Sequence, residues 1–331
     1  MKISIVIPTY NRPEQLSDVL KHIFASVTTG FESIEVIVVD DGSKIPAREI
    51  VEALSPPAPF RLKYVYQENA GPAEARNHGF RLAEHDIVLF IDDDILVFPE
   101  LIQKHAEAHI EQPASVIFGQ SPYPPMTKPT PAYRYLNGLA DDSLRSVGAH
   151  STRAVKVEIV ASGNLSVEKR LFKERDVYSP GLKIPVGEEY ELSAYLLKNA
   201  IPLFFYPSIK GWHLQPVTIQ DSCIQNYKYG LGIAELAAKR PDVLELRQPR
   251  FIFDANSPVK ADDPFKLKIK KYLRRGMTNQ MIRNAMLAAV SASEKLIRSD
   301  KILFPMYRLV VGNFFAAGIK DGREMFSGEN N

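Results

Sequence analysis

Residues 87–94 read IVLFIDDD, five apolar residues followed at once by three aspartates. A short, continuous apolar run between polar residues is typical of a strand buried on both faces of a parallel sheet. Residues 3–7 (ISIVI) and 34–39 (IEVIVV) repeat this pattern, and residues 14–24 between them carry apolar side chains at helical spacing. This alternation predicts an α/β fold, a doubly wound and mainly parallel sheet with flanking helices.

The chain continues the alternation until its composition changes near residue 262. We expect further helices over 47–54, 73–82, 99–111, 188–198 and 219–239, and further strands over 61–66, 115–119 and 201–206. Five prolines between Ser121 and Pro131 predict a long loop, which we extend over 121–150. Residues 262–331 are first basic and then amphipathic, which predicts a helical C-terminal extension.

The overall composition is that of an ordinary globular protein. Apolar residues make up 45% of the 331 residues, and the formal net charge of +2 is too small to favour nucleic acid as a partner. The single cysteine, Cys223, excludes an internal disulfide framework. The N-terminus lacks the features of a signal peptide, and the most apolar stretch, 302–319, is interrupted by Pro305, Arg308 and Asn313. We therefore expect a cytoplasmic protein without a membrane span.

Polar residues follow four of the expected strands, at the sheet edge where open α/β folds bind ligands. The first loop is 8–13 (PTYNRP), the second begins with Asp40 and Asp41, and the third is 69–79 (NAGPAEARNHG). A carboxylate pair can accept hydrogen bonds from a base or a ribose, and a helix N-terminus attracts anions. The alternatives are local: a turn with a helix start, an Asx turn with an N-cap, and a helix cap.

The fourth loop, Asp92 to Asp94, carries the sharpest signal. Three adjacent carboxylates repel one another, and a hard divalent cation relieves that repulsion. Alternation along an extended strand predicts that Asp92 and Asp94 point to one side and Asp93 away from them. The alternative is an acidic surface turn.

Two motifs further along the chain add candidate chemistry. Glu188 and Glu189 stand at an expected helix start, where one of them can act as a general base. Acidic residues at that position also complement the helix dipole without any catalytic role. His213 follows another strand-like segment; a lone histidine is more often structural, but here it is a candidate metal ligand.

Taken in order, these motifs resemble glycosyltransferase family 2, whose members have the GT-A nucleotide-sugar-binding fold. The resemblance covers residues 1–240 and rests on residues 4–12, 38–43, 69–79, 91–94, 162–164, 187–192 and 212–213. It implies that residues 1–120 form the nucleotide-sugar-binding half of one domain. Residues 121–240 would then form its acceptor-binding and catalytic half.

The resemblance also implies a role for each matching residue on the donor side. The residues expected to contact the nucleotide-sugar are Pro8, Thr9, Asn11, Arg12, Asp40, Asp41, Arg76, Asp92 and Asp93. Asp41 would contact the base, usually uracil, with Asp40 near it. Asp94 would bind Mn²⁺ or Mg²⁺ beside the diphosphate, and Asp92 and His213 would be the further metal ligands.

On the acceptor side, Gly163 and Asn164 would shape the face that binds the sugar and its acceptor. Glu189 would be the base that removes a proton from the attacking hydroxyl. The chain has Glu188-Glu189 where the family usually has Glu-Asp. Because the longer side chain displaces the carboxylate, Glu188 stays open as the alternative base.

The implied activity is metal-dependent, inverting transfer of a sugar from a nucleoside-diphosphate donor, with UDP expected. The acceptor would be a hydroxyl of a glycan or a lipid-linked molecule, selected in part by the 121–150 loop. The alternatives are a nucleotidyltransferase, which would need a glycine-rich basic loop after the first strand, and a non-catalytic nucleotide-sugar-binding protein. The basic segment 265–275 (FKLKIKKYLRR) predicts either a peripheral membrane contact of residues 262–331, at the inner face, or a solvated helix face.

Overall fold

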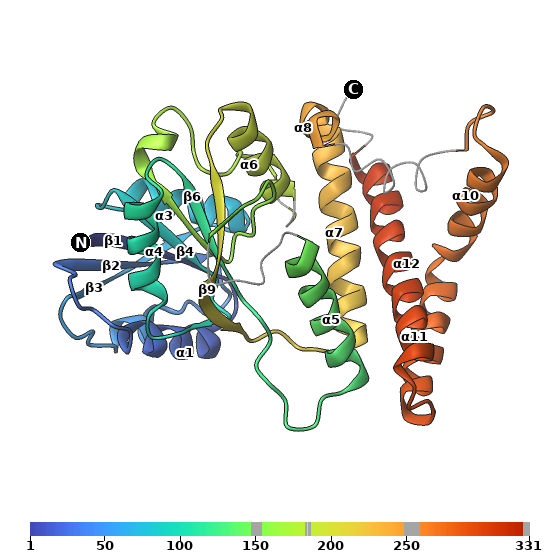
Figure 1. The fold of residues 1–331 in the computed structure, drawn as a ribbon, viewed down its shortest axis with the longest axis horizontal. Helices are drawn as coiled ribbons and strands as arrows, with labels where there is room; N and C mark the ends of the chain where they lie inside the picture. The colour runs from blue at the N-terminus through green and yellow to red at the C-terminus, as the bar shows by residue number, and fades with distance from the viewer. Residues whose placement is uncertain (147–153, 183, 185–186, 248–258, 327–331) are drawn as a thin grey trace. The chain divides into compact units, whose positions relative to one another are not determined.

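The computed structural model describes residues 1–146, 154–182, 184, 187–247 and 259–326 (Figure 1). Residues 147–150 of the expected 121–150 loop and residues 327–331 of the expected extension lie outside this part. The chain forms two compact units. The first comprises Met1–Pro125, Ala140–Lys183 and Glu188–Gln215, and the second comprises Met126–Leu139, Ile184–Gly187 and Pro216–Asn331.

The first unit is built on a nine-stranded sheet in the order β3-β2-β1-β4-β8-β6-β9-β5, with β7 paired to β9. The strands are β1 (Lys2–Thr9), β2 (Ser33–Asp41), β3 (Phe60–Gln67), β4 (Ile87–Ile91), β5 (Ile95–Val97), β6 (Val116–Gln120), β7 (Val155–Lys156), β8 (Asn164–Glu168) and β9 (Leu203–His213). The expected parallel arrangement is found from β3 to β4 and between β6 and β9. β8 runs antiparallel to both β4 and β6, so the sheet as a whole is mixed.

Helices cover both faces of this sheet. On one face α1 (Pro13–Phe24), α2 (Arg48–Glu52) and α4 (Leu101–Glu111) share an apolar core with alternate residues of β1 and β2. On the other, α3 (Pro72–Leu82), α6 (Gly187–Lys198) and a 3₁₀ turn at Lys169–Phe172 pack around Val6, Phe90 and Tyr178. Because both faces are covered, the strands read as continuous apolar runs.

Two stretches of the first unit differ from the sequence-based expectation. The helix expected over 47–54 is only the short α2. The strand expected over 201–206 continues to His213, past Pro207, which has no backbone N–H to donate. The register of β6 against β9 shifts at this point, from Gly119 opposite Tyr206 to Gln120 opposite Lys210. This irregularity lets the strand pass the proline, so β9 reaches β5 and places His213 opposite Ile95.

Helix α5 (Pro131–Ser146) occupies most of the stretch expected as a loop over 121–150. Within the described residues 121–146 the proline-rich beginning is irregular, and Pro131 is the first helical residue, a position that tolerates the missing N–H. That part of the prediction was wrong because the prolines mark a helix start as well as a loop.

The second unit is helical. It contains the first part of α5 with α7 (Ile219–Lys239), α8 (Pro241–Arg247), α10 (Phe265–Met277), α11 (Gln280–Leu296) and α12 (Asp300–Phe326). α7, which we had grouped with residues 121–240, therefore packs with the C-terminal helices. Gly318 of α12 lies directly against α7, where a Cβ would overlap the carbonyl oxygen of Tyr227.

α12 is long and apolar enough to cross a membrane by length and composition, with a mean hydropathy of 1.5 over its best 18 residues. Half of that window is buried inside the protein. Tyr307 and Val310 are fully buried in the core of this unit, and Asn313 donates to the Met277 carbonyl at 2.8 Å.

Candidate active site

The carboxyl ends of the parallel strands β1, β2 and β4 meet at one edge of the sheet, as predicted. The first loop is joined to the second because the Asn11 N–H donates to Ser43 Oγ at 2.8 Å and Asn11 Oδ1 accepts from Lys44 N at 2.8 Å. Thr9 Oγ1 donates to Asp93 Oδ2 at 2.8 Å, which joins the first loop to the fourth. Residues more than 80 positions apart in the chain thus form one polar edge.

Asp40 and Asp41 hold the neighbouring loops in place. The fully buried Asp40 carboxylate accepts hydrogen bonds from the backbone N–H groups of Ser43 and Ala47, both at 2.9 Å. This is the turn and cap that formed the alternative interpretation of the motif. Asp41 accepts from the backbone N–H groups of Ala70 and Gly71, both at 2.9 Å, and so shapes the third loop. Contact of Asp41 with a base stays a prediction.

Asp92, Asp93 and Asp94, which we call the acidic turn, lie in a tight turn between β4 and β5. Side-chain alternation holds only along an extended strand, so the prediction that Asp93 points away was wrong. Arg12 Nη1 instead bridges Asp93 Oδ1 at 3.0 Å and Asp94 Oδ2 at 2.8 Å. Burial raises the pKa of Asp93 to about 6 despite the opposing effects of Arg12 and Thr9.

Asp94 and His213 have the arrangement expected of cation ligands. His213 Nε2 lies 3.3 Å from Asp94 Oδ1, an oxygen that is buried and accepts no hydrogen bond from the described residues. Burial by itself would raise the pKa of Asp94, but His213 and Arg12 together hold it below its usual value. The backbone N–H of His213 donates to the Pro122 carbonyl, and the Tyr123 ring stacks on the imidazole.

This pair fits a divalent cation that also binds a diphosphate. Such cations usually take one or two protein carboxylates and complete their shell with phosphate and water oxygens. Among the described residues, no three or more His, Cys, Asp and Glu side chains gather as they would in an all-protein metal cage. Asp92 Oδ1 is paired with Arg76, so the predicted role of Asp92 as a metal ligand has no support beyond the sequence.

Arg76 lies between two carboxylates from distant segments. Its Nη2 is 2.6 Å from Asp92 Oδ1, and its Nη1 is 3.0 Å from Glu188 Oε1. Arg76 and Glu188 are both buried, and the guanidinium lies over the Tyr178 ring. Burial raises the pKa of Glu188 to about 7, although Arg76 opposes this shift. Arg76 therefore connects the acidic turn to the first turn of α6.

The segment Ser162–Asn164 brings Asp92 and Glu189 together. The Ser162 N–H donates to Glu189 Oε1 at 2.8 Å, and the Asp92 N–H donates to the Gly163 carbonyl at 3.1 Å. A Cβ on Gly163 would lie 2.6 Å from Asp92 Oδ2, so only glycine lets the carboxylate approach so closely. Burial raises the pKa of Glu189, with the Ser162 N–H opposing. Two consecutive residues thus hold both carboxylates.

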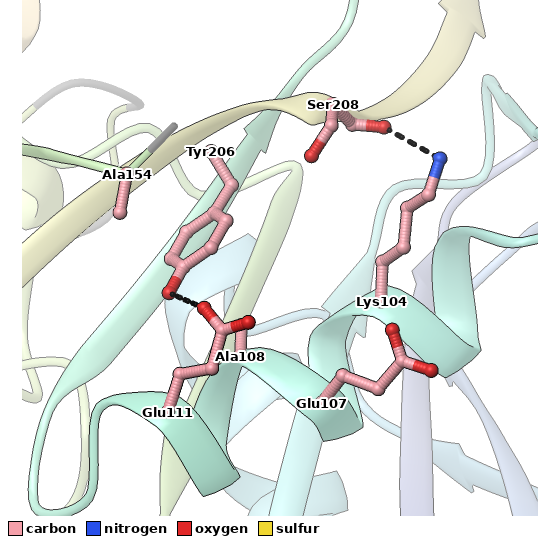
Figure 2. Close-up of a pocket in the computed structure, with 7 residues that line it drawn as sticks. All are labelled: Lys104, Glu107, Ala108, Glu111, Ala154, Tyr206 and Ser208. Carbon is pink, nitrogen blue, oxygen red and sulfur yellow. Dashed lines mark hydrogen bonds between the residues drawn. The ribbon is translucent and has the colours of Figure 1, made fainter. Parts of the chain in front are cut away.

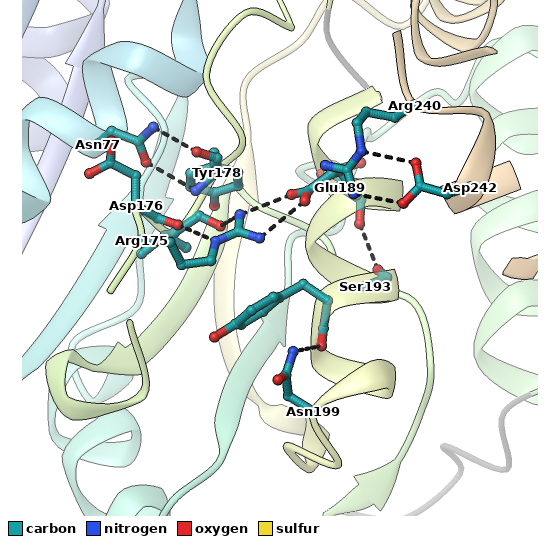
Figure 3. A network of polar contacts seen from close by, with 12 residues as sticks. Asn77, Arg175, Asp176, Tyr178, Glu189, Ser193, Asn199, Arg240 and Asp242 are labelled. Atoms are coloured by element: carbon teal, nitrogen blue, oxygen red, sulfur yellow. Dashed lines mark hydrogen bonds and ion pairs between the residues drawn. The ribbon is translucent and has the colours of Figure 1, made fainter. Parts of the chain in front are cut away.

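Asn77 of the third loop supports this site together with Arg175 and Tyr178, two residues that the sequence did not reveal. Asn77 forms two hydrogen bonds with the backbone of Tyr178, at 2.8 and 3.0 Å, and Arg175 forms a two-pronged ion pair with Glu191 of α6 (Figure 3). These contacts fix the segment before α6 against α3. No local motif marks Tyr178 or Arg175, because their partners lie far away in the chain.

Asn164 does not present its side chain at the polar edge. Its amide is buried and bonded to His105 of α4, so any effect of Asn164 on the acceptor face acts through its backbone. A separate cavity of about 480 Å³ lies between α4 and β9, lined by Lys104, Glu111 and Tyr206 among others (Figure 2). None of the predicted site residues lines it.

Residues 4–161 match the family model described as glycosyl transferase family 2. Over 120 residues the chain is 41% identical to validoxylamine A glucosyltransferase of Streptomyces hygroscopicus subsp. jinggangensis, a match that covers 35% of this chain and 28% of that relative. The chain thus spans less than a third of the curated relative that it matches.

Two solved structures share the fold over almost the whole chain. The mannosyltransferase PcManGT from Pyrobaculum calidifontis, in complex with GDP-Man and Mn²⁺, aligns with a TM-score of 0.57 and 15% identity, covering 95% of this chain and 86% of that one. S. aureus TarS 1–349 in complex with UDP aligns with a TM-score of 0.52 and 18% identity, covering 98% and 92%. At these identities the likeness concerns the fold.

Proposed function

We propose that this chain, which matches the family model of glycosyltransferase family 2 over residues 4–161 and shares the GT-A fold, transfers a sugar from a nucleoside-diphosphate sugar to a hydroxyl group. The observation that carries the proposal is that the candidate metal ligands and the candidate bases lie at one edge of the sheet. The buried Oδ1 of Asp94 lies 3.3 Å from His213 Nε2. Arg76 pairs Asp92 with Glu188, and the Ser162–Asn164 segment holds both Asp92 and Glu189. A candidate cation-binding pair and a candidate base thus occur in one site.

Asp94 and His213 are the residues that would hold Mn²⁺ or Mg²⁺. When bound, such an ion stabilises the negative charge that develops on a departing diphosphate. Thr9 and Arg12 lie against the same acidic turn. We propose that Arg12 contributes to binding the phosphates, since a guanidinium pairs well with phosphate oxygens. UDP is the donor nucleotide that the family resemblance favours.

We assign the role of base to Glu189. Glu188 is paired with Arg76 and its side chain is only 4% exposed, which suits a structural ion pair. Glu189 accepts a hydrogen bond from the Ser162 N–H through Oε1, and we propose that its other oxygen takes the acceptor proton. A pKa raised by burial brings a carboxylate closer to the range in which general bases work best. Direct attack by the deprotonated hydroxyl would invert the anomeric centre.

A donor screen tests the activity. The full chain is incubated with UDP- and GDP-linked sugars, with Mn²⁺ or with EDTA, and release of nucleoside diphosphate is measured. We expect turnover with at least one donor and its loss in EDTA. Tight donor binding without turnover would instead support the non-catalytic binding protein. Pyrophosphate release from a nucleoside triphosphate and a sugar phosphate would support the nucleotidyltransferase.

Substitutions at α6 test the base. Glu189→Gln removes the basic oxygen while keeping the hydrogen bond to Ser162, so kcat should fall about 100- to 10,000-fold. Glu189→Asp restores the residue usual in the family and should retain much more activity than Glu189→Gln. If Glu188→Gln abolished turnover and Glu189→Gln did not, the assignment would pass to Glu188.

We also propose that α10 contacts an anionic membrane, where a lipid-linked acceptor would lie. Among the side chains of this helix that the structure describes, three large apolar ones are exposed: Phe265 (77%), Ile269 (43%) and Tyr272 (62%). Lys266 and Lys268 lie among them, and each basic residue near an anionic surface contributes about 1 kcal/mol. Apolar and basic groups on one helix match the two components of such a surface.

Flotation with liposomes tests this contact. The full chain should float with vesicles of phosphatidylglycerol and phosphatidylcholine, less with phosphatidylcholine alone, and less at high salt. Phe265→Glu with Tyr272→Glu should abolish flotation, whereas Leu296→Glu, at an equally exposed position on α11, should not. Equal flotation of both variants and the wild type would exclude α10 as the contact.

A further inference from the structure

Two buried histidines of α4 take no part in the proposed reaction. His105 is fully buried and His109 is nearly so. His105 Nδ1 and His109 Nε2 each lie 2.8 Å from Ser166 Oγ of β8, and His105 Nε2 lies 2.8 Å from Asn164 Oδ1. The four side chains form one continuous chain of hydrogen bonds between α4 and β8.

The direction of these hydrogen bonds follows from the chemistry of their ends. Asn164 Nδ2 lies 3.5 Å from the Gln120 carbonyl oxygen, and Asn164 Oδ1 faces His105 Nε2 at 2.8 Å, where an amide oxygen can only accept. His105 Nε2 therefore carries a proton. Burial lowers the pKa of His105 to about 3, so the ring is neutral and its Nδ1 accepts from the Ser166 hydroxyl.

The contacts of His109, at the other end of this series of hydrogen bonds, agree with the same donor and acceptor assignment. With its own hydrogen donated to His105, Ser166 Oγ accepts from His109 Nε2–H. His109 Nδ1 is then unprotonated, and it forms no hydrogen bond with any described residue. Glu168 lies 3.8 Å from it, beyond hydrogen-bond range, and is already paired with Arg170. Burial lowers the pKa of His109 to about 4, against the effect of Glu168.

This series of hydrogen bonds ends at Asn164, in the segment that holds the candidate catalytic carboxylates. Asn164 is the first residue of β8, and it directly follows Ser162 and Gly163, which bond to Glu189 and Asp92. We infer that His105 is a positioning residue for the reaction, orienting Asn164 so that the Ser162–Asn164 segment holds Glu189 beside Asp92. The inference rests on the proposed function for its catalytic meaning.

The test compares two substitutions at one position. His105→Gln offers an amide whose NH₂ can donate to Asn164 and whose oxygen can accept from Ser166, whereas His105→Leu can do neither. We expect His105→Leu to lower kcat about 10- to 100-fold per folded molecule, with donor KM within about twofold of wild type. His105→Gln should recover most of kcat. A role in folding alone would lower the melting temperature of the leucine variant without this split between kcat and KM.

Equal kcat for His105→Leu and wild type, or equal losses for both variants, would overturn the inference. If the wild type turns over no donor, the proposed function fails separately. The inference is then decided by a crystal structure of His105→Leu. Loss of the 2.8 Å contact between Ser162 N and Glu189 Oε1 would support it, and an intact contact would overturn it.

Discussion

Replacing Arg76 with methionine removes the one cation between Asp92 and Glu188 while keeping a long side chain. The Arg76 and Glu188 side chains are only 6% and 4% exposed, and their charged atoms are 3.0 Å apart. Removing one member of a buried ion pair leaves the other charge uncompensated, which typically costs about 3–5 kcal/mol. We therefore expect Arg76→Met to lower the free energy of unfolding at pH 8 by less than this amount, because protonation of Glu188 relieves part of the cost.

The destabilisation caused by Arg76→Met should depend on pH, because protonation neutralises the buried Glu188 carboxylate. In the folded protein its pKa is raised to about 7, from an ordinary value of 4.5. The folded state therefore retains a proton that the unfolded state releases, and stability falls as pH rises through this window. A shift of this size corresponds to about 3 kcal/mol. Without Arg76 the pKa of Glu188 rises further, so the variant continues to lose stability above pH 7.

Urea unfolding at pH 5 and pH 8 measures the effect. Trp212, the single tryptophan, packs against Phe98 in the first unit, so its fluorescence reports the unfolding of that unit. Arg76→Met should be clearly more destabilised at pH 8 than at pH 5. Adding Glu188→Gln to Arg76→Met should remove most of this difference. Equal losses at both pH values, or no rescue in the double variant, would refute the coupling between Arg76 and Glu188.

Three further predictions concern other contacts. Gly163→Ala places a methyl group against the Asp92 carboxylate, so kcat should fall by about 100-fold while donor binding measured by calorimetry changes little. Arg12→Ala removes a cation that neutralises the acidic turn, so Mn²⁺ should bind several-fold more tightly. A titration followed by electron paramagnetic resonance measures this affinity, and unchanged or weaker binding would contradict the prediction. Gly318→Ala should lower stability by about 1–3 kcal/mol in thermal unfolding followed by circular dichroism, because the new methyl group meets the backbone of α7. Gly312→Ala, on the same helix with open space around it, should be neutral or stabilising.

Elements with a strong local pattern were predicted closely from the sequence. The helix expected over 219–239 has those bounds as α7, and the strands expected over 3–7 and 34–39 are extended by at most two residues at either end. In such segments the spacing of apolar residues reflects burial along the element itself, and no distant partner is needed to read it. The polar strand ends were recognised for the same reason, since parallel strands present their carboxyl ends at one edge.

The remaining features depend on contacts between residues that are far apart in the sequence, which the local spacing of apolar residues does not reveal. The antiparallel insertion of β8, the continuation of β9 past Pro207 and the helix α5 were not predicted. Each depends on which neighbour the segment meets in the folded chain. The same holds for Arg76, whose two carboxylate partners are 16 and 112 residues away.

The sequence by itself determined the class of fold, the edge of the sheet that carries the site, and the residue types gathered there. It could do so because strand burial and strand-end chemistry are local properties of the chain. Only the tertiary structure decided that the acidic turn is bridged by Arg12, that Glu188 is paired with Arg76, and that Glu189 is held by the Ser162 N–H. The reason is physical: which carboxylate pairs with a cation and which accepts a backbone hydrogen bond depends on distances across the fold.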